Sequence, residues 1–380
     1  MNQKSKVVLA KWEDCTGCMA CVDSCKFDAI EIINNKAGFK YPVIDYTKCR
    51  NCGTCTKKCT VLNKDSIQLK KALKCAAAKI LDDDVRDGCT SGGLCTALAK
   101  KYLEEGDLVY GASFIKYEGV KHIRLDKLCE LPSIKGSKYV QSDMHGIFKS
   151  ISNDLKITDK NILFIGTPCQ VASIEHYFKN ERITTVSFIC GGVMSSKMLF
   201  NYLNELNIPI SQIKNVIFRE KQTYLIRVQK RNSPDFIESR NKSAYLKTYD
   251  AGYTIRESCE KCIYCTRDRP GDITLGDFWG IEKTDLKTKN ESSMSCVISS
   301  TSKGLDLLCS LPDLLMEPTS LDIIGRYNFR LDNPRYTDRL SIQRYIFKKI
   351  YGLFNFHNSQ KLTDFVSRLL INKYTQFFSK

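Results

Sequence analysis

Two identical cysteine runs near the start of the chain constrain its fold more than any other feature. Each run has the spacing C-x2-C-x2-C-x3-C, and together they contain Cys15, Cys18, Cys21, Cys25, Cys49, Cys52, Cys55 and Cys59. The chain has nineteen cysteines in all, but no apolar run suited to a signal peptide or a transmembrane helix. We therefore expect a cytoplasmic protein, in which disulfides rarely persist. Metal or cluster ligation, with some buried free thiols, explains so many cysteines better.

This is the spacing with which bacterial-type ferredoxins bind two 4Fe–4S clusters, the fourth cysteine of each run serving the other cluster. The predicted ligand sets are Cys15, Cys18, Cys21 and Cys59 for one cluster, and Cys49, Cys52, Cys55 and Cys25 for the other. Lys26 and Thr60 stand where proline usually follows the fourth cysteine, a change that removes no ligand. The alternatives are zinc or free thiols, but zinc takes a single set of four ligands. We predict an α+β ferredoxin module over residues 1–70, with short strands at 30–32 and 41–44.

Residues 71–380 are far more than an electron carrier needs, and their pattern is that of a larger α/β region. A helix-like stretch at 69–81 precedes a small-residue loop, 86–93, which opens a helix at 94–103. Buried strands follow at 108–114, 161–166 and 185–189, and the last two run through tight turns into helices at 171–178 and 196–206. In α/β folds, ligand sites lie at such carboxyl ends of strands. We divide this region into domains at 71–185 and 186–330, followed by a basic amphipathic helical tail at 331–380.

Five further cysteines fall into a second pattern. Cys169 and Cys190 each follow soon after one of these strands, and Cys259, Cys262 and Cys265 share one short loop. We predict that Cys169, Cys190, Cys259 and Cys262 hold a third 4Fe–4S cluster, with Cys265 as a spare ligand. The alternative is a group of buried thiols or one reactive cysteine. The other cysteines lack ligand spacing and are expected to be plain thiols: Cys75, Cys89, Cys95, Cys129, Cys296 and Cys309.

Together these segments resemble the coenzyme F-420 hydrogenase/dehydrogenase beta-subunit family, fused to an N-terminal ferredoxin domain. The likeness covers about residues 1–330 and lies in Arg86 and in residues 90–93, 136–142, 166–170, 190–192, 259–262, 271–272 and 276–280. It implies a flavin-binding region with FAD as the cofactor. The implied site residues are Ser91, Gly92 and Gly93 at the phosphates, Lys138 at the pyrophosphate or the reduced flavin, Gly166, Thr167 and Pro168 beside the isoalloxazine, and Gly276 and Asp277. The alternative is that these are ordinary turn residues. Gly191 stands where many members have histidine, so a proton-donor role at that position is in doubt.

The resemblance implies an iron–sulfur flavoprotein oxidoreductase, which passes electrons between its clusters and FAD and on to an organic substrate or a deazaflavin-type coenzyme. Some relatives are associated with surface-polysaccharide metabolism. The alternative is a non-catalytic subunit that relays electrons within a larger redox complex. Either role needs a redox partner protein or a ferredoxin-type donor.

The net charge of +16 suits an acidic partner or a membrane surface, and no nucleic-acid-binding motif accompanies it. The basic tail is either a pair of helices packed on the body or a segment that docks to a partner or to the membrane periphery.

Overall fold

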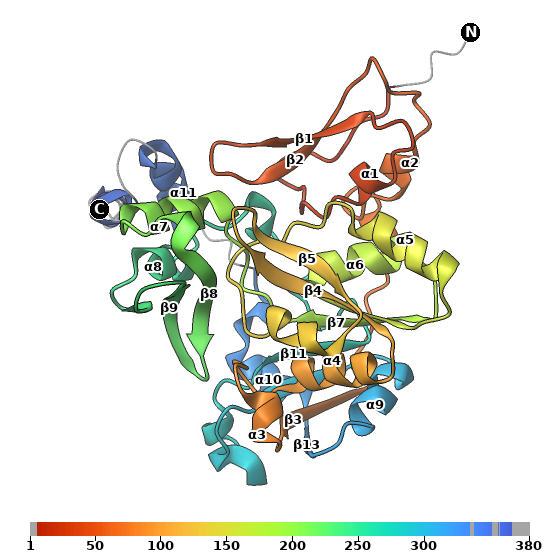
Figure 1. Ribbon diagram of the computed structural model, residues 1–380, viewed down its shortest axis with the longest axis vertical. Helices are drawn as coiled ribbons and strands as arrows, with labels where there is room; N and C mark the ends of the chain where they lie inside the picture. Colours follow the sequence, from red (N-terminus) through yellow and green to blue (C-terminus); the bar gives the residue numbers. More distant parts are fainter. Residues whose placement is uncertain (1–5, 335–337, 352–355, 357, 367–380) are drawn as a thin grey trace, which may run out of the picture.

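The computed structural model describes residues 6–334, 338–351, 356 and 358–366. The N-terminal part is a small module built around the two cysteine runs (Figure 1). Strands β1 (Ile30–Asn34) and β2 (Lys40–Ile44) pair antiparallel, which confirms the two predicted strands. One helical turn follows each cysteine loop, α1 (Ala20–Asp23) and α2 (Thr54–Lys57), and a 3-10 turn, η1 (Lys64–Ser66), ends the module. Gly17 and Gly53 have φ values of 72° and 73°, so both loops pass through the left-handed region that glycine permits.

The body is an eight-stranded sheet in the order β13-β3-β12-β11-β7-β6-β4-β5. Its four central strands, from β11 to β4, run parallel, and antiparallel strands extend it on both sides. This is the larger α/β region that the sequence predicts. The bounds are β3 (Lys74–Ile80), β4 (Leu108–Ile115), β5 (Gly119–Leu125), β6 (Ile162–Gly166), β7 (Ile183–Phe188), β11 (Ile273–Asp277), β12 (Ser295–Ser299) and β13 (Leu314–Thr319).

Helices cover both faces of this sheet. α4 (Leu94–Glu104) and α9 (Ser302–Cys309) pack on one face, and α5 (Ile147–Ile157), α6 (Pro168–Tyr177) and α10 (Leu321–Tyr327) pack on the other. The helices predicted at 94–103 and 171–178 are thus confirmed, with shifted ends. Short helical turns complete the body: α3 (Asp83–Arg86), η2 (Leu128–Ile134), η4 (Glu257–Cys259), η5 (Ile281–Lys283), η6 (Lys287–Asn290) and η7 (Phe329–Leu331). Among the described residues, no helix combines the length and the apolar character needed to cross a bilayer.

The helix predicted at 69–81 is wrong, because the structure has strand β3 there. Its alanines favour a helix by intrinsic propensity. However, β3 lies between β13 and β12, and residues 75–80 are buried. Ala78 and Ile80 pack with α4, whereas Cys75 and Ala77 pack on the opposite face. Pairing on both edges and burial of both faces therefore outweigh the local preference.

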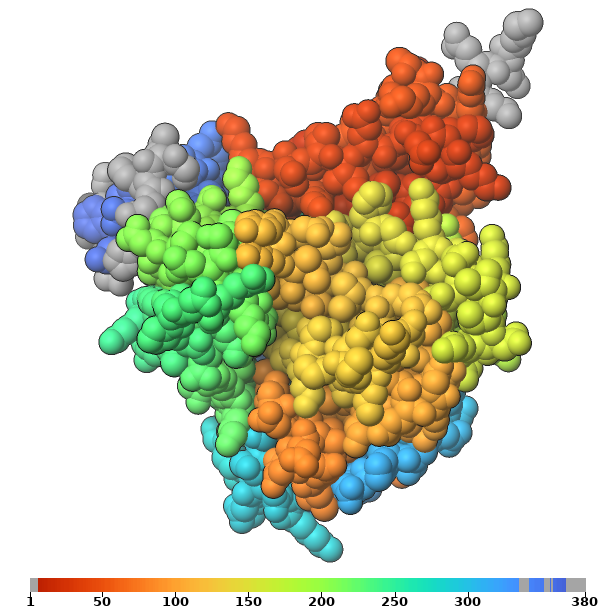
Figure 2. Space-filling model, in the orientation of Figure 1, coloured from red at the N-terminus to blue at the C-terminus, as the bar shows by residue number. Residues whose placement is uncertain are grey.

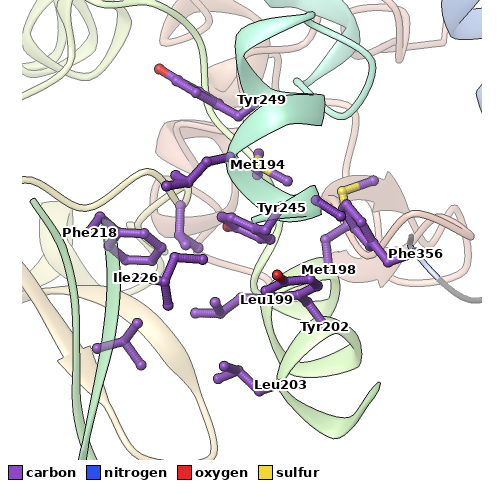
Figure 3. Packing of buried hydrophobic residues seen from close by; sticks show 14 of the residues in the cluster. Met194, Met198, Leu199, Tyr202, Leu203, Phe218, Ile226, Tyr245, Tyr249 and Phe356 are labelled. Carbon is purple, nitrogen blue, oxygen red and sulfur yellow. The ribbon is translucent and has the colours of Figure 1, made fainter. Parts of the chain in front are cut away.

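A second, three-stranded sheet stands beside the body, in the order β10-β9-β8 (Figure 1). It consists of β8 (Ile213–Glu220), β9 (Thr223–Lys230) and β10 (Phe236–Ser239), with α7 (Ser196–Glu205), α8 (Ala244–Asp250) and the turn η3 (Ile210–Gln212). Leu199 and Tyr202 of α7 meet Phe218, Ile226 and Tyr245 in its core (Figure 3). α7 confirms the helix predicted at 196–206.

This arrangement bears on the predicted domains and the tail. The large sheet contains strands from both sides of position 185, and strand β7 itself includes residues 185 and 186. The predicted boundary between these two residues therefore falls inside one sheet. The tail begins with α11 (Asp338–Ile350), whose Phe347 is buried in the core of the small sheet together with Phe356. Within the described residues, the tail therefore packs on the protein; the part of the predicted tail beyond residue 366 lies outside them.

The ferredoxin module lies along one side of the body as a continuous layer (Figure 2). The Asp23 carboxylate accepts hydrogen bonds from the backbone N–H groups of Gly146 and Phe148 at 2.9 and 3.0 Å, at the N-terminus of α5. Lys40 forms an ion pair with Asp143 at 2.6 Å. These contacts place the cysteine loops against the carboxyl ends of the central strands.

Candidate functional site

Two cavities lie inside the ferredoxin module, and each is lined by four cysteines. The first is enclosed by Cys15, Cys18, Cys21 and Cys59, and the second by Cys25, Cys49, Cys52 and Cys55. The fourth cysteine of each run therefore lies with the first three of the other, as in the predicted ligand sets.

The chemistry of these thiols fits a bound cluster. Burial raises the pKa of Cys18 to about 11 and that of Cys21 well above its ordinary value, because a bare thiolate is poorly solvated there. A cationic metal core would supply the missing stabilisation. Backbone N–H groups of Ala29 and Asn51 each donate to a cysteine sulfur, of Cys25 and Cys49, at 3.4 Å. Such hydrogen bonds tune cluster thiolates.

A single metal ion fits these cavities less well than a cluster. In the described part of the chain, no group of three or more His, Cys, Asp or Glu side chains is arranged to hold one ion. The cysteines instead surround a hollow, as a multi-atom group between four sulfurs requires. Cys52 is exposed, so the second cavity reaches the surface.

A third cavity lies where the module meets the body. It is lined by Cys169, Cys190, Cys259, Cys262 and Cys265. Cys169 belongs to the first turn of α6, Cys190 follows β7, and the others lie in the turn that begins with η4. The structure thus brings together all four predicted ligands and the spare. Burial raises the pKa of Cys190 to about 12 and that of Cys259 to about 11, so this cavity also favours a positively charged metal core over bare thiolates.

Sequence reasoning missed the arginines around this third cavity. Arg256 and Arg330 line it, and Arg269 lies close enough to act electrostatically on Cys190, Cys262 and Cys265. Arg256 and Arg269 lie on either side of the cysteine turn in the sequence. Their position could have indicated that positive charges lie near this cavity. No other local pattern indicates them.

The first and third cavities share a wall. Thr16 lines both, and its carbonyl oxygen accepts a hydrogen bond from the Gln141 amide at 2.8 Å. The Arg256 guanidinium donates to the carbonyl oxygen of Cys15 at 2.7 Å and to the Gln141 side chain at 2.9 Å. A β carbon at Gly17 would lie 2.8 Å from both of these side chains. Only glycine therefore lets this loop approach the body so closely.

Several residues implied in a flavin site have structural partners instead. The Gly92 N–H donates to the Ser295 hydroxyl at 2.9 Å, and that hydroxyl also bonds to Ser91. Gly93 begins α4 with a φ of 80°. Gly276 faces Cys296, whose sulfur would lie 3.0 Å from an added β carbon. The loop at 91–93 is therefore held to β12, and its N–H groups are not all available for phosphate.

The turn after β6 belongs to the third cavity. Thr167 caps α6 through Gln170, Pro168 is the first residue of that helix, and both line the cavity with Cys169. Gly166 packs against Phe164 and Gln170, which would lie 2.8 and 3.1 Å from an added β carbon. These residues thus shape the cysteine-lined cavity.

Lys138 and Asp277 are the implied residues with the clearest electrostatic role. Lys138 is half-buried, and among the described residues its ammonium group donates only to the carbonyl oxygens of Lys135 and Gly136, at 2.8 and 3.2 Å. Burial lowers its pKa to about 8. The hydroxyls of Thr90 and Ser137, each next to an implied residue in the chain, lie 3.0 Å apart. By contrast, Asp277 is engaged by Arg219 in an ion pair of 2.5 Å.

Six cysteines remain outside the three cavities, as predicted from their spacing. Cys75 and Cys296 are buried, Cys89 and Cys95 are half-buried, and Cys129 and Cys309 are exposed.

Comparisons with known proteins agree with this architecture. Residues 159–313 match the family model for the C terminus of the coenzyme F-420 hydrogenase/dehydrogenase beta subunit, and residues 14–63 match that of a 4Fe–4S dicluster domain. A chain from the F-420-reducing NiFe hydrogenase complex of Methanosarcina barkeri, in a xenon-derivatised structure, has a similar fold. It is 16% identical with a TM-score of 0.53, over 73% of this chain and 94% of that chain. No curated protein matches the chain.

Proposed function

We propose that this chain is an iron–sulfur flavoprotein oxidoreductase. It is a coenzyme F-420 hydrogenase/dehydrogenase beta-subunit-like protein with an N-terminal 4Fe–4S ferredoxin domain. The eight cysteines of the two runs hold two 4Fe–4S clusters in the first and second cavities. The third cavity holds another cluster on Cys169, Cys190, Cys259 and Cys262, or with Cys265 in place of one of them. Clusters bound at such sites supply one-electron transfer.

The shared wall between the first and third cavities is the observation that carries this proposal. A free-standing electron carrier needs no fixed contact with a larger domain, yet here Thr16 borders both cavities. Arg256 and Gln141 hold the loop that contains Thr16 by hydrogen bonds of 2.7 to 2.9 Å. The module is therefore held in one orientation, with the first site next to the third and Cys52 of the second site at the surface.

Lys138 supports FAD as the further cofactor. A half-buried ammonium group with only carbonyl acceptors, and with its pKa lowered by burial, lacks a compensating anion. The pyrophosphate of FAD has that charge, and the hydroxyls of Thr90 and Ser137 offer hydrogen bonds beside it. FAD links one-electron clusters to two-electron chemistry on an organic substrate or a deazaflavin-type coenzyme. Surface-polysaccharide metabolism as the setting, and a cytoplasmic location, rest on the sequence alone.

The experiment is a cofactor inventory of the whole chain, purified without oxygen. We expect about twelve irons and one FAD per chain, from three 4Fe–4S sites. C259S should lower the iron content by about four, whereas C309S, at an exposed cysteine outside the cavities, should leave it unchanged. About eight irons in the wild type would refute the third cluster, and an absence of flavin would refute the flavoprotein.

The second candidate function is a flavin-free protein that relays electrons within a larger complex. The internal hydrogen bonds of the 91–93 loop favour it, because they occupy the Gly92 N–H that a phosphate would need. In that case the same inventory would give about twelve irons and no FAD.

A further inference from the structure

Two buried arginines beside the third cavity have no anionic partner of their own. Arg256 and Arg269 are each 1% exposed. Their hydrogen-bond acceptors are all neutral oxygens, of Cys15, Lys40 and Gln141 for Arg256, and of Tyr264, Thr266 and Phe188 for Arg269. Within the described ranges, neither guanidinium forms an ion pair with a carboxylate.

A third arginine nearby gives the contrast. Arg344 is 2% exposed, but it pairs with Glu260 at 2.5 Å. Buried charges are normally compensated in this way, because desolvation makes an unpaired charge costly. Arg256 and Arg269 therefore indicate that the occupied cavity carries a net negative charge. A 4Fe–4S core together with its four thiolates, as in the proposed function, carries such a charge, although the core alone is positive.

The position of Arg256 is also tightly held. Its guanidinium lies 4.3 Å from the centre of the Tyr41 ring, which is stacked on Trp12 with 4.7 Å between ring centres. Arg256 thus places one fixed positive charge between the first and third cavities. The second cavity has a positive charge on its wall as well, that of Arg50, but Arg50 and Cys52 both reach solvent. Water and salt therefore screen the Arg50 charge.

We propose that Arg256 and Arg269 raise the reduction potential of the third site. An electron that enters at the exposed Cys52 end then occupies the third site in preference to the two sites of the ferredoxin module. This inference rests on the proposed function. Reduction places one electron, from an external one-electron reductant, on the third site; no bond forms or breaks, and no proton is needed. A fixed buried positive charge stabilises the more negative, reduced form, since Coulomb energies grow as the effective dielectric falls. Arg256 and Arg269 are thus positioning residues, which act through the charge they hold at the cavity.

The test is potentiometry of the full chain, followed by electron paramagnetic resonance of each iron–sulfur signal. C169S identifies the third-site signal by its loss. In the wild type, that signal should have the highest potential of the three. R256Q should lower the third-site potential by at least 59 mV, which is a tenfold change in the reduction equilibrium of a one-electron couple. R256K, which keeps the charge, should stay close to the wild type, and R50Q is the matched control that should leave the third-site potential unchanged.

Two results would overturn the inference. The first is a reduction potential of the wild-type third site that lies below the potentials of the two sites in the ferredoxin module. The second is an unchanged third-site potential in R256Q with iron fully retained. If R256Q loses iron, R269Q makes the same test with the second arginine, and the wild-type order of potentials decides independently. A wild-type iron content of about eight would instead refute the third cluster of the proposed function.

Discussion

Replacing Gly17 with alanine would press a methyl group into the contact between the ferredoxin module and the body. The β carbon would lie 2.8 Å from a nitrogen atom of both Arg256 and Gln141. Gly53 occupies the same place in the second cysteine run and has nearly the same φ, 73° against 72°, but nothing lies within 4 Å of its added β carbon. G53A is therefore a matched control, because it shares the backbone strain of G17A without the overlap.

The two costs can be separated by their origin. A left-handed conformation costs a residue with a β carbon about 1–2 kcal/mol, which applies to both variants. Overpacking adds about 1–3 kcal/mol in a site that cannot yield freely, and Arg256 is fixed by three hydrogen bonds and an aromatic ring. We expect G17A to lose about 2–5 kcal/mol of stability and G53A about 1–2 kcal/mol.

The assay is urea unfolding of the loaded proteins without oxygen, followed by cluster absorbance and tryptophan fluorescence. Proteins with tightly bound cofactors depart from two-state behaviour, so the comparison uses transition midpoints under one set of conditions. The urea concentration at the midpoint should be highest for the wild type, lower for G53A and lowest for G17A. Equal midpoints for the two variants would refute the view that the module is clamped to the body through Arg256 and Gln141.

Three other side chains lead to separate predictions. Burial lowers the pKa of His122 to about 4, so between about pH 6.5 and pH 4 the unfolded chain binds a proton that the native chain does not. Stability should therefore fall by up to ~3 kcal/mol as the pH drops through that range, and H122Q should remove this part of the pH dependence of urea unfolding. D277N removes the ion-pair partner of Arg219, which is 4% exposed. It should cost about 3 kcal/mol and lower the melting temperature; an unchanged melting temperature would contradict this. K138A should lower the FAD content of purified protein at least tenfold while iron stays constant, and an equal flavin content would argue against a pyrophosphate at Lys138.

Local sequence determined a large part of this protein. The two cysteine runs predict a ferredoxin module, because short spacings within a loop decide which sulfurs can reach one site. The strand–turn–helix segments around Cys169 and Cys190 also emerge from local patterns, since buried apolar runs and helix caps are encoded by neighbouring residues. The same local view fails at residues 74–80, where alanine-rich sequence enters the large sheet as β3. There the partners that decide the outcome, β12 and β13, lie more than two hundred residues away.

Only the tertiary structure decided what surrounds the third cavity. Arg256 is 241 residues from Cys15 in the chain, yet its guanidinium bonds to that residue's carbonyl oxygen. Long-range contacts of this kind depend on how sheets, helices and the N-terminal module pack, and no spacing of residue types records them. The spacing of the cysteines in the sequence therefore predicts which sulfurs share a site. The charged residues around those sulfurs come together only when the chain is folded.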